Sequence, residues 1–480
     1  MYRKLNEKII SNLKDIVGEN NVIVEASKII DYSHDEFSLS EISRMPEAVI
    51  KPANSSEIAE IMKLATKEKI PVVARGGATG LCGGCVPLYG GIVISLERMN
   101  RIIEIDEKNL MATVEAGVNL KEFYSVLEEK NLFFPPHPGE ESATIGGVIS
   151  TNAGGARAVK YGTIRNFLRG LEVVCADGKI IRPGGKLIKD STGYSLLHLF
   201  AGSEGTLGIV TQATLSVLPE PEDSMTLLVP YETVDDALNT VPFILKLPTR
   251  PLAIEFISKK IISIAEHYCG TSWPSVKGEI FLMVMLDGSR LEIEKYCEKI
   301  AEICLSSGAC DAFVADSREK QKKILHVRSV VYEALKSSTI EILDVTLPPD
   351  QMAFHIAFVE ELSQKYNVWL PTYGHAGDGN LHTHIMKTTV DGRQIEKWKE
   401  IYKNIRDLII SDGIRRGGKI SGEHGIGMVK KEYLEMCLGQ DYVDILKKIK
   451  KALDPLLIMN PGKIFDPDLD GNNGVSGAER

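Results

Sequence analysis

The sequence lacks a long uninterrupted apolar run. Every stretch of membrane-spanning length contains charges or glycines, which disfavours a transmembrane helix. The N-terminal residues space Leu5, Ile9 and Leu13 along one face of an amphipathic helix, without the continuous apolar centre of a secretion signal. We therefore expect a cytoplasmic protein that does not insert into a membrane.

An excess of positive charge is also lacking, because 56 lysines and arginines are outnumbered by 65 aspartates and glutamates. The 480 residues carry a net charge of −9, so we expect no basic face able to displace counterions from phosphates. This charge balance disfavours nucleic acid as a partner. Apolar residues make up 44% and charged residues 25% of the chain, as in ordinary globular proteins. The length predicts two or three domains rather than a single core.

Cysteines are few and scattered. The chain has eight, and their spacing matches neither an iron–sulfur cluster nor a complete zinc site. Cys82 and Cys85 form one C-x-x-C pair, which could serve redox chemistry or metal binding. Because no second pair accompanies them, we favour two small side chains in a crowded glycine loop. The cysteines are expected to be reduced thiols.

The strict G-x-G-x-x-G fingerprint of a Rossmann fold is missing as well, although an acidic residue, Glu97, lies at a suitable distance downstream. In its place are three glycine-rich segments, at 76–84, 135–164 and 197–219. Glycines let backbone N–H groups approach an anion or a flat ligand without obstruction. Three such segments predict an extended cofactor that is touched at several points, although structural turns alone would explain any one of them.

A proline-acid break, PEPED at 219–223, is the predicted domain boundary. From 224 to 420 strands alternate with long helices, one of them over 318–338, which predicts an α+β domain whose sheet is covered on one face. The expected domains are therefore 1–220, which carries the glycine segments, and 221–420. A helical segment at 421–465 and a disordered tail at 466–480 complete the chain.

The chemistry is concentrated in two motifs, GHAGDGNLHTH at 374–384 and SGEHGIG at 421–427. His375 and His382 flank a glycine turn, and Glu423 lies in the second motif. Two imidazoles and one carboxylate are a usual donor set for a catalytic divalent metal. The adjacent His424 is the candidate base, because imidazole suits proton transfer near neutral pH.

Other polar residues near these motifs have simpler interpretations. We read His384 as structural or as a support behind the metal ligands. Asp378 is interpreted as a turn former and Asp344 as a strand-edge acid.

Several motifs together resemble one family. They are RGGATGLCGG, TIGGVISTNAGG, AGSEGTLGIVTQATL, HAGDGNLH, SGEHGIG and MNPGKIF. Over about 40–465 the chain resembles the FAD-linked oxidases and dehydrogenases of the vanillyl-alcohol-oxidase type. It is most similar to the branch with D-lactate and D-2-hydroxyglutarate dehydrogenases and the catalytic subunit of glycolate oxidase. The resemblance implies an α+β fold, with a two-part FAD-binding domain and a cap whose antiparallel sheet is covered by helices.

The resemblance also implies which residues bind FAD. No histidine lies between His34 and His137 to tether the flavin, so we expect noncovalent FAD. His137, between prolines, fits either a position near the flavin or a rigid loop. The implied contacts are Arg75, Gly76, Gly77, Ala78, Thr79, Gly80, Pro138, Thr144, Ile145, Gly146, Gly147, Asn152, Gly154, Gly155, Gly162, Glu204, Gly205 and Ile209.

For the active site, the resemblance implies zinc or ferrous iron on His375, His382 and Glu423, with His424 as the base. Arg328 would bind the substrate carboxylate; without the resemblance it would be read as a solvated helix residue. The strand EILDVTLP lacks the lysine of the 2-hydroxyglutarate enzymes, which favours a monocarboxylate such as D-lactate or glycolate. Electrons are expected to leave through a partner, an electron-transfer flavoprotein or an iron–sulfur subunit.

Three alternatives remain open at this stage. The chain could be a D-2-hydroxyglutarate dehydrogenase. It could also be a flavin-binding electron-transfer subunit without substrate chemistry, which would predict a degraded metal motif. A flavin-free metal hydrolase would leave the three glycine segments without a purpose.

Overall fold

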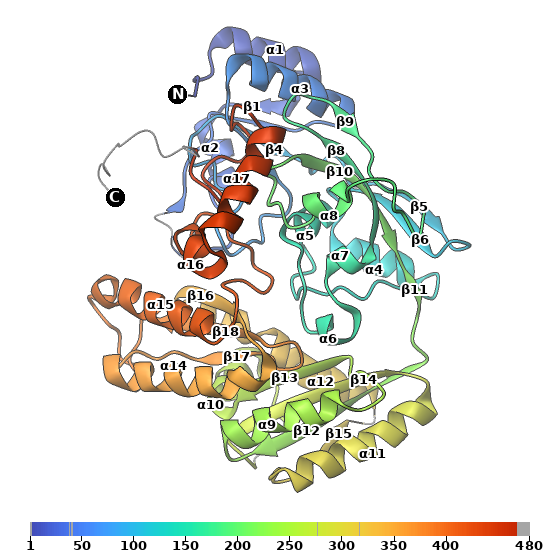
Figure 1. Ribbon diagram of the computed structural model, residues 1–480, viewed down its shortest axis with the longest axis vertical. Coiled ribbons are helices and arrows are strands. Elements are labelled where there is room, and N and C mark those ends of the chain that lie inside the picture. The colour runs from blue at the N-terminus through green and yellow to red at the C-terminus, as the bar shows by residue number, and fades with distance from the viewer. Residues whose placement is uncertain (1, 38, 40–41, 276, 316, 468–480) are drawn as a thin grey trace.

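The computed structural model describes residues 2–37, 39, 42–275, 277–315 and 317–467 (Figure 1). Of the predicted disordered tail, only Asp466 and Pro467 lie within the described residues. Among these residues, no helix is both long enough and apolar enough to cross a membrane.

The N-terminal part contains two sheets that share one hydrophobic core. Helix α3 begins after Asn54, whose side chain accepts a hydrogen bond from the backbone N–H of Glu57 and caps the helix. The first sheet has the order β1-β2-β4-β3, in which β2, β4 and β3 are parallel. Strand β3 leads directly into the first glycine segment. The elements are α1 (Glu7–Val17), β1 (Val22–Ile23), β2 (Ala48–Ile50), α3 (Ser55–Glu68), β3 (Val72–Arg75) and β4 (Ile92–Ser95).

The second sheet is antiparallel, with the order β5-β6-β10-β8-β9. The second glycine segment forms a short helix, α5, which packs against β6 and β10. A separate pair of strands, β7 and β11, precedes the cap. The elements are β5 (Ile102–Asp106), β6 (Met111–Glu115), α4 (Leu120–Glu128), β7 (Leu132–Phe133), α5 (Ile145–Thr151), α6 (Ala158–Tyr161), α7 (Ile164–Phe167), β8 (Leu168–Val174), β9 (Ile180–Ile181), α8 (Leu196–Phe200), β10 (Ile209–Ser216) and β11 (Leu218–Pro219).

The cap is built on an antiparallel sheet that, within the described ranges, has the strand order β15-β12-β14-β13-β17-β18-β16. This agrees with the predicted α+β class. Its elements are β12 (Asp223–Tyr231), α9 (Val234–Leu245), β13 (Ala253–Ser258), α10 (Lys259–Cys269), β14 (Ile280–Gly288), α11 (Arg290–Ser306), β15 (Phe313–Ala315), α12 (Arg318–Ser329), α13 (Val331–Lys336), β16 (Thr339–Thr346), α14 (Met352–Tyr366), β17 (Thr372–His375), β18 (Asn380–Met386) and α15 (Trp398–Arg415).

The expectation that helices cover only one face of this sheet was wrong. Helices α9, α11 and α14 pack on one face, and α10, α12 and α13 pack on the other. The physical reason lies in strands such as β14, which is apolar on both faces rather than alternating, so both faces must be buried. The single helix predicted over 318–338 is interrupted at Val330, which separates α12 from α13.

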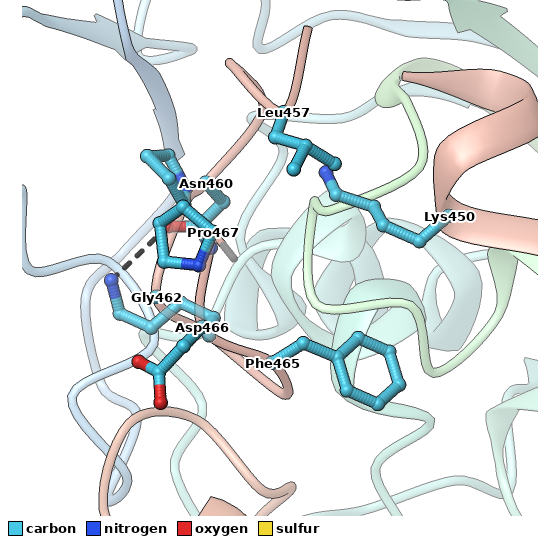
Figure 2. Close-up of a pocket in the computed structure, with 9 residues that line it drawn as sticks. Lys450, Leu457, Asn460, Gly462, Phe465, Asp466 and Pro467 are labelled. Atoms are coloured by element: carbon cyan, nitrogen blue, oxygen red, sulfur yellow. Dashed lines mark hydrogen bonds between the residues drawn. The ribbon is translucent and has the colours of Figure 1, made fainter. Parts of the chain in front are cut away.

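After the cap, the chain returns to the N-terminal part through α16 (Leu434–Leu438) and α17 (Gln440–Leu453) (Figure 1). Met459 forms a parallel bridge with Val72 beside β3. Lys450 extends from α17 towards the segment that carries Leu457 (Figure 2). Its buried ammonium donates to the carboxylate of Asp454 and to two backbone carbonyls, those of Thr206 and Met459. Lys450 therefore fastens the end of the chain to the N-terminal core.

We expect Lys450→Ala to lower the free energy of unfolding by about 3 kcal/mol, because it leaves the buried carboxylate of Asp454 without its cationic partner. The exposed neighbour Lys448 provides the control, and Lys448→Ala should change stability by no more than about 0.5 kcal/mol. The measurement is urea unfolding followed by flavin fluorescence and circular dichroism. Equal midpoints for the two variants would contradict this role.

Candidate functional site

A cavity of about 780 Å³ lies between the N-terminal part and the cap. The three glycine segments line one side of it, and cap residues, including Arg328, line the other. Most of the residues that the resemblance implied for FAD are in its wall. They are Arg75, Gly76, Gly77, Ala78, Thr79, Gly80, Pro138, Thr144, Gly146, Gly147, Gly155, Glu204, Gly205 and Ile209.

Four of the implied FAD contacts are not among the lining residues. Ile145 is fully buried in the core. The side-chain carbonyl of Asn152 accepts hydrogen bonds from Thr163 and from the backbone N–H of Arg165. Gly162 follows α6 with φ +79°, and Gly154 faces Glu423. These four residues belong to the second glycine segment, but they lie behind the residues that line the cavity.

Close packing explains the glycines of the first segment. A Cβ on Gly76 would lie 2.1 Å from the hydroxyl of Thr144, and one on Gly77 would lie 2.8 Å from the backbone oxygen of Ser142. The first and second glycine segments therefore lie too close together at these two positions for any residue but glycine, with backbone facing backbone at Gly77. The wall that they form offers room for a large flat ligand.

The second half of the site is the predicted metal centre. His375 ends β17 and His382 lies on the paired strand β18, so the hairpin brings their rings together. Their Nε2 atoms are 3.4 Å apart, and Oε1 of Glu423 lies 3.5 Å from the first and 3.4 Å from the second. The structure thus assembles all three predicted donors from two distant segments.

This arrangement fits a divalent cation. Tetrahedral zinc bound at about 2.1 Å separates its nitrogen and oxygen ligands by roughly 3.4 Å, which is the spacing observed here. Oε2 of Glu423 is buried and has no hydrogen-bond partner among the residues that the structure describes. Burial alone would raise the pKa of Glu423, but hydrogen bonds from His375 and His382 hold it well below its usual range. The carboxylate is therefore ionised, as a metal ligand must be.

Glu255 on β13 supports this centre from behind, and sequence reasoning missed it. One carboxylate oxygen bonds Nδ1 of His375, and the other pairs with Arg328. Burial would raise the pKa of Glu255, but the charges of His375 and Arg328 lower it to about 2. A carboxylate behind a histidine ligand fixes the ring and its tautomer. The available signal was a single acid within the apolar strand LAIEFIS.

His424 lies beside the three predicted metal donors and lines the cavity. Its ring stacks on that of His382, with centroids 5.1 Å apart and planes inclined by 10°. Burial lowers the pKa of His424 to about 4, with the charge of His382 contributing and Asp344 opposing. The imidazole is therefore neutral near pH 7 and able to accept a proton.

The remaining polar residues fall into supporting positions. His384 is buried and hydrogen-bonded to the hydroxyls of Thr339 and Tyr373. Asp378 accepts the backbone N–H of Asn380 within the turn. His137 lines the cavity and stacks on Tyr124.

Asp344 is not the simple strand-edge acid that the sequence suggested. Strand β16 is an edge strand, but the chain around Lys419 covers that edge, and Asp344 is fully buried. Burial would raise the pKa of Asp344, but His424 and Lys430 hold it well below its usual range. Asp344 is therefore a buried charge beside the site.

The cysteines form no disulfide within the described part of the chain. Cys82 and Cys85 both line the cavity, and Cys82 donates to the backbone oxygen of Gly425. Burial raises the pKa of Cys82 above its ordinary value, which leaves an inert thiol.

Comparison with known proteins identifies the family. The family described as FAD linked oxidases, C-terminal domain, matches residues 220–464, and an FAD binding domain matches residues 46–184. The chain belongs to the FAD-linked oxidases. The resemblance seen in the motifs is thereby confirmed, and this FAD-linked oxidase has an FAD-binding domain that accounts for the glycine-lined wall of the cavity.

Curated relatives of this FAD-linked oxidase match along nearly their whole length. A D-lactate dehydrogenase of Archaeoglobus fulgidus is 42% identical over 92% of this chain and 98% of its own. The glycolate oxidase subunit GlcD of Bacillus subtilis is 38% identical over 97% of this chain and 98% of its own. The solved structure of p-cresol methylhydroxylase with substrate bound aligns with a TM-score of 0.79 at 16% identity, over 97% of this chain and 99% of that one. That likeness confirms the predicted fold.

We expect Glu255→Gln to weaken zinc binding by roughly 10- to 100-fold, because the substitution loosens the carboxylate support of His375. Equilibrium dialysis of the FAD-loaded protein measures the change. Glu279→Gln alters an exposed acid that pairs with Lys259 and serves as the control. Equal zinc affinities for the two variants would show that Glu255 does not support metal binding.

Proposed function

We propose that this FAD-linked oxidase is a D-2-hydroxy-acid dehydrogenase of the lactate or glycolate class. The observation that carries the proposal is the donor set of His375, His382 and Glu423, which opens with His424 onto the glycine-lined cavity. The names of the relatives, D-lactate dehydrogenase and glycolate oxidase subunit, support the same substrate class.

When bound, zinc or ferrous iron would lower the pKa of the substrate hydroxyl, and noncovalent FAD would accept a hydride. His424 takes the hydroxyl proton. Because its Nδ1 faces Asp344 at 4.0 Å, Nε2 is the nitrogen left to accept that proton. The His424 side chain is only 12% exposed, so it holds the proton largely away from bulk water while the substrate carbon is oxidised.

Arg328 binds the substrate carboxylate in this proposal. Glu255 holds its guanidinium from one side, and the ring of Tyr373 lies 4.9 Å away. The Nε of Arg328 is buried without a partner among the described residues, which leaves a donor for a ligand. An arginine held in this way can fix which face of the substrate meets the flavin.

D-2-hydroxyglutarate is the second candidate substrate. Strand β16 lacks the lysine expected for a second carboxylate, but Lys322 and His326 on α12 line the same cavity as Arg328. The alternative of a subunit without substrate chemistry is disfavoured because the metal donors are intact. A metal hydrolase without flavin is disfavoured by the FAD-binding family match.

The direct test is anaerobic bleaching of the flavin with a panel of D- and L-2-hydroxy acids, before and after chelation. We expect D-lactate or glycolate to bleach the bound flavin, and a chelator to prevent it. Bleaching by D-2-hydroxyglutarate alone would favour the second candidate. No bleaching by any acid would refute the proposal.

The variant His424→Asn should keep its flavin but lose at least about 100-fold in the rate of flavin reduction by D-lactate, because the proton acceptor is gone. Stopped-flow absorbance under nitrogen gives the rate. The control is His198→Asn, which changes an exposed histidine on α8. Normal bleaching of His424→Asn would exclude this residue as the base.

Electrons are proposed to leave through a partner, an electron-transfer flavoprotein or an iron–sulfur subunit. One relative is itself named a subunit. We therefore expect the isolated protein, given D-lactate in air, to form peroxide far more slowly than it reduces an artificial dye. Stoichiometric peroxide at the full turnover rate would mean that oxygen is the acceptor.

A further inference from the structure

Asp344 is a fully buried carboxylate on β16, next to the metal centre but outside its donor set. Its Oδ2 accepts the hydroxyl of Ser421 at 2.7 Å. The same oxygen accepts three successive backbone N–H groups, from Gly422 at 3.0 Å, Glu423 at 3.1 Å and His424 at 2.9 Å. The backbone of residues 422–424 therefore curves around the carboxylate of Asp344.

The other oxygen of Asp344 reaches the opposite side of the site. Oδ1 accepts the side-chain amide of Asn380 at 2.7 Å, and Asn380 is the first residue of β18. One carboxylate therefore links the hairpin that carries His375 and His382 to the loop that carries Glu423 and His424.

The two neighbouring rings also turn towards Asp344. Nδ1 of His382 lies 3.9 Å from Oδ1, and Nδ1 of His424 lies 4.0 Å from Oδ2. Neither Nδ1 has a hydrogen-bond partner in the part of the chain that the structure describes. With Nδ1 of each ring directed at a carboxylate, Nε2 of each ring is left for the cavity side.

A second cation on Asp344, His382 and His424 is the competing interpretation, since their donor atoms lie within 4.8 Å of one another. Two observations oppose it. The buried ammonium of Lys430 lies 3.5 Å from Oδ2 and already supplies a positive charge. Oδ2 also accepts four donors, which leaves it poorly available to a metal.

We infer that Asp344 is the positioning residue that holds Glu423 and His424 in register with the histidines of the hairpin. It acts through these residues and does not touch the reacting atoms. The inference rests on the proposed function for the role of His424, while its part in metal binding stands on the donor geometry alone.

The test compares Asp344→Asn with Glu341→Gln on FAD-loaded protein. The amide keeps the size of the side chain but removes its charge and one of its two acceptor oxygens, so it cannot accept from both the loop N–H groups and Asn380. Zinc affinity by equilibrium dialysis is expected to fall roughly 10- to 100-fold. At saturating zinc, the limiting rate of flavin reduction by D-lactate should fall by a similar factor, while the substrate concentration for half-maximal rate stays near that of the unsubstituted protein, because Arg328 is untouched.

Glu341→Gln is the matched control. Glu341 is an equally buried acid on β16, but it accepts from Tyr402 and pairs with Arg406, both of which lie on α15 and not in the loop. This variant should keep both zinc affinity and reduction rate. A loss equal to that of Asp344→Asn would mean that any buried charge on β16 matters and would overturn the inference.

If Asp344→Asn does not fold, Ser421→Ala tests the positioning role of Asp344 instead. It removes one hydrogen bond to Asp344 and the one that Ser421 accepts from Gly425, so a loss of about five-fold in zinc affinity is expected. Unchanged affinity in a folded variant of either residue would refute the positioning role. If the unsubstituted protein binds zinc but no 2-hydroxy acid bleaches it, the proposed function fails while the dialysis still tests Asp344.

Discussion

The site depends on how one loop is held between two domains. Residues 421–427 run between the cap and the FAD-binding part, and one carboxylate from each side accepts their backbone N–H groups. Asp344 of the cap binds the first half of the loop, and Glu204 accepts from Ile426 and Gly427 at 2.7 Å each. Because Glu204 also lines the cavity, the loop is fixed to the wall that the cofactor would face.

This arrangement separates the tasks of the two domains. The glycine segments supply a backbone surface with few side chains, suited to a large ligand. The cap supplies charge: Arg328, the two histidines and the acids behind them. Glu423 and His424 are adjacent in the sequence, so a single loop position sets both the proposed metal ligand and the neighbouring imidazole. A small displacement of the loop would therefore disturb metal binding and proton transfer together.

Much of this could be predicted from the sequence, because the relevant residues sit in short motifs. The glycine segments and the GHAGDGNLHTH and SGEHGIG motifs identify the cavity wall and the metal donors directly. Glu255 and Asp344 could not be assigned in this way, since each is an acid in a largely apolar strand whose hydrogen-bond partners lie at least 36 residues away. Only the strand order of the cap brings them behind the histidines.

The two-sided cover of the cap sheet was missed for a related reason. A strand such as EIFLMVML reads as apolar, but its sequence does not say what packs on each face. The interruption at Val330 likewise carries no proline or glycine to mark it. Tertiary packing decides both features, and it draws on segments that are distant along the chain.

The bridge between Val72 and Met459 has a consequence for synthesis. The strand that contains Val72 leaves the ribosome early, whereas its partner follows only after the whole cap has been made. The edge of the N-terminal sheet at Val72 therefore remains unpaired until Met459 has emerged. The cap is continuous in sequence and has no such delay, so during translation it can become compact before the domain that precedes it is complete.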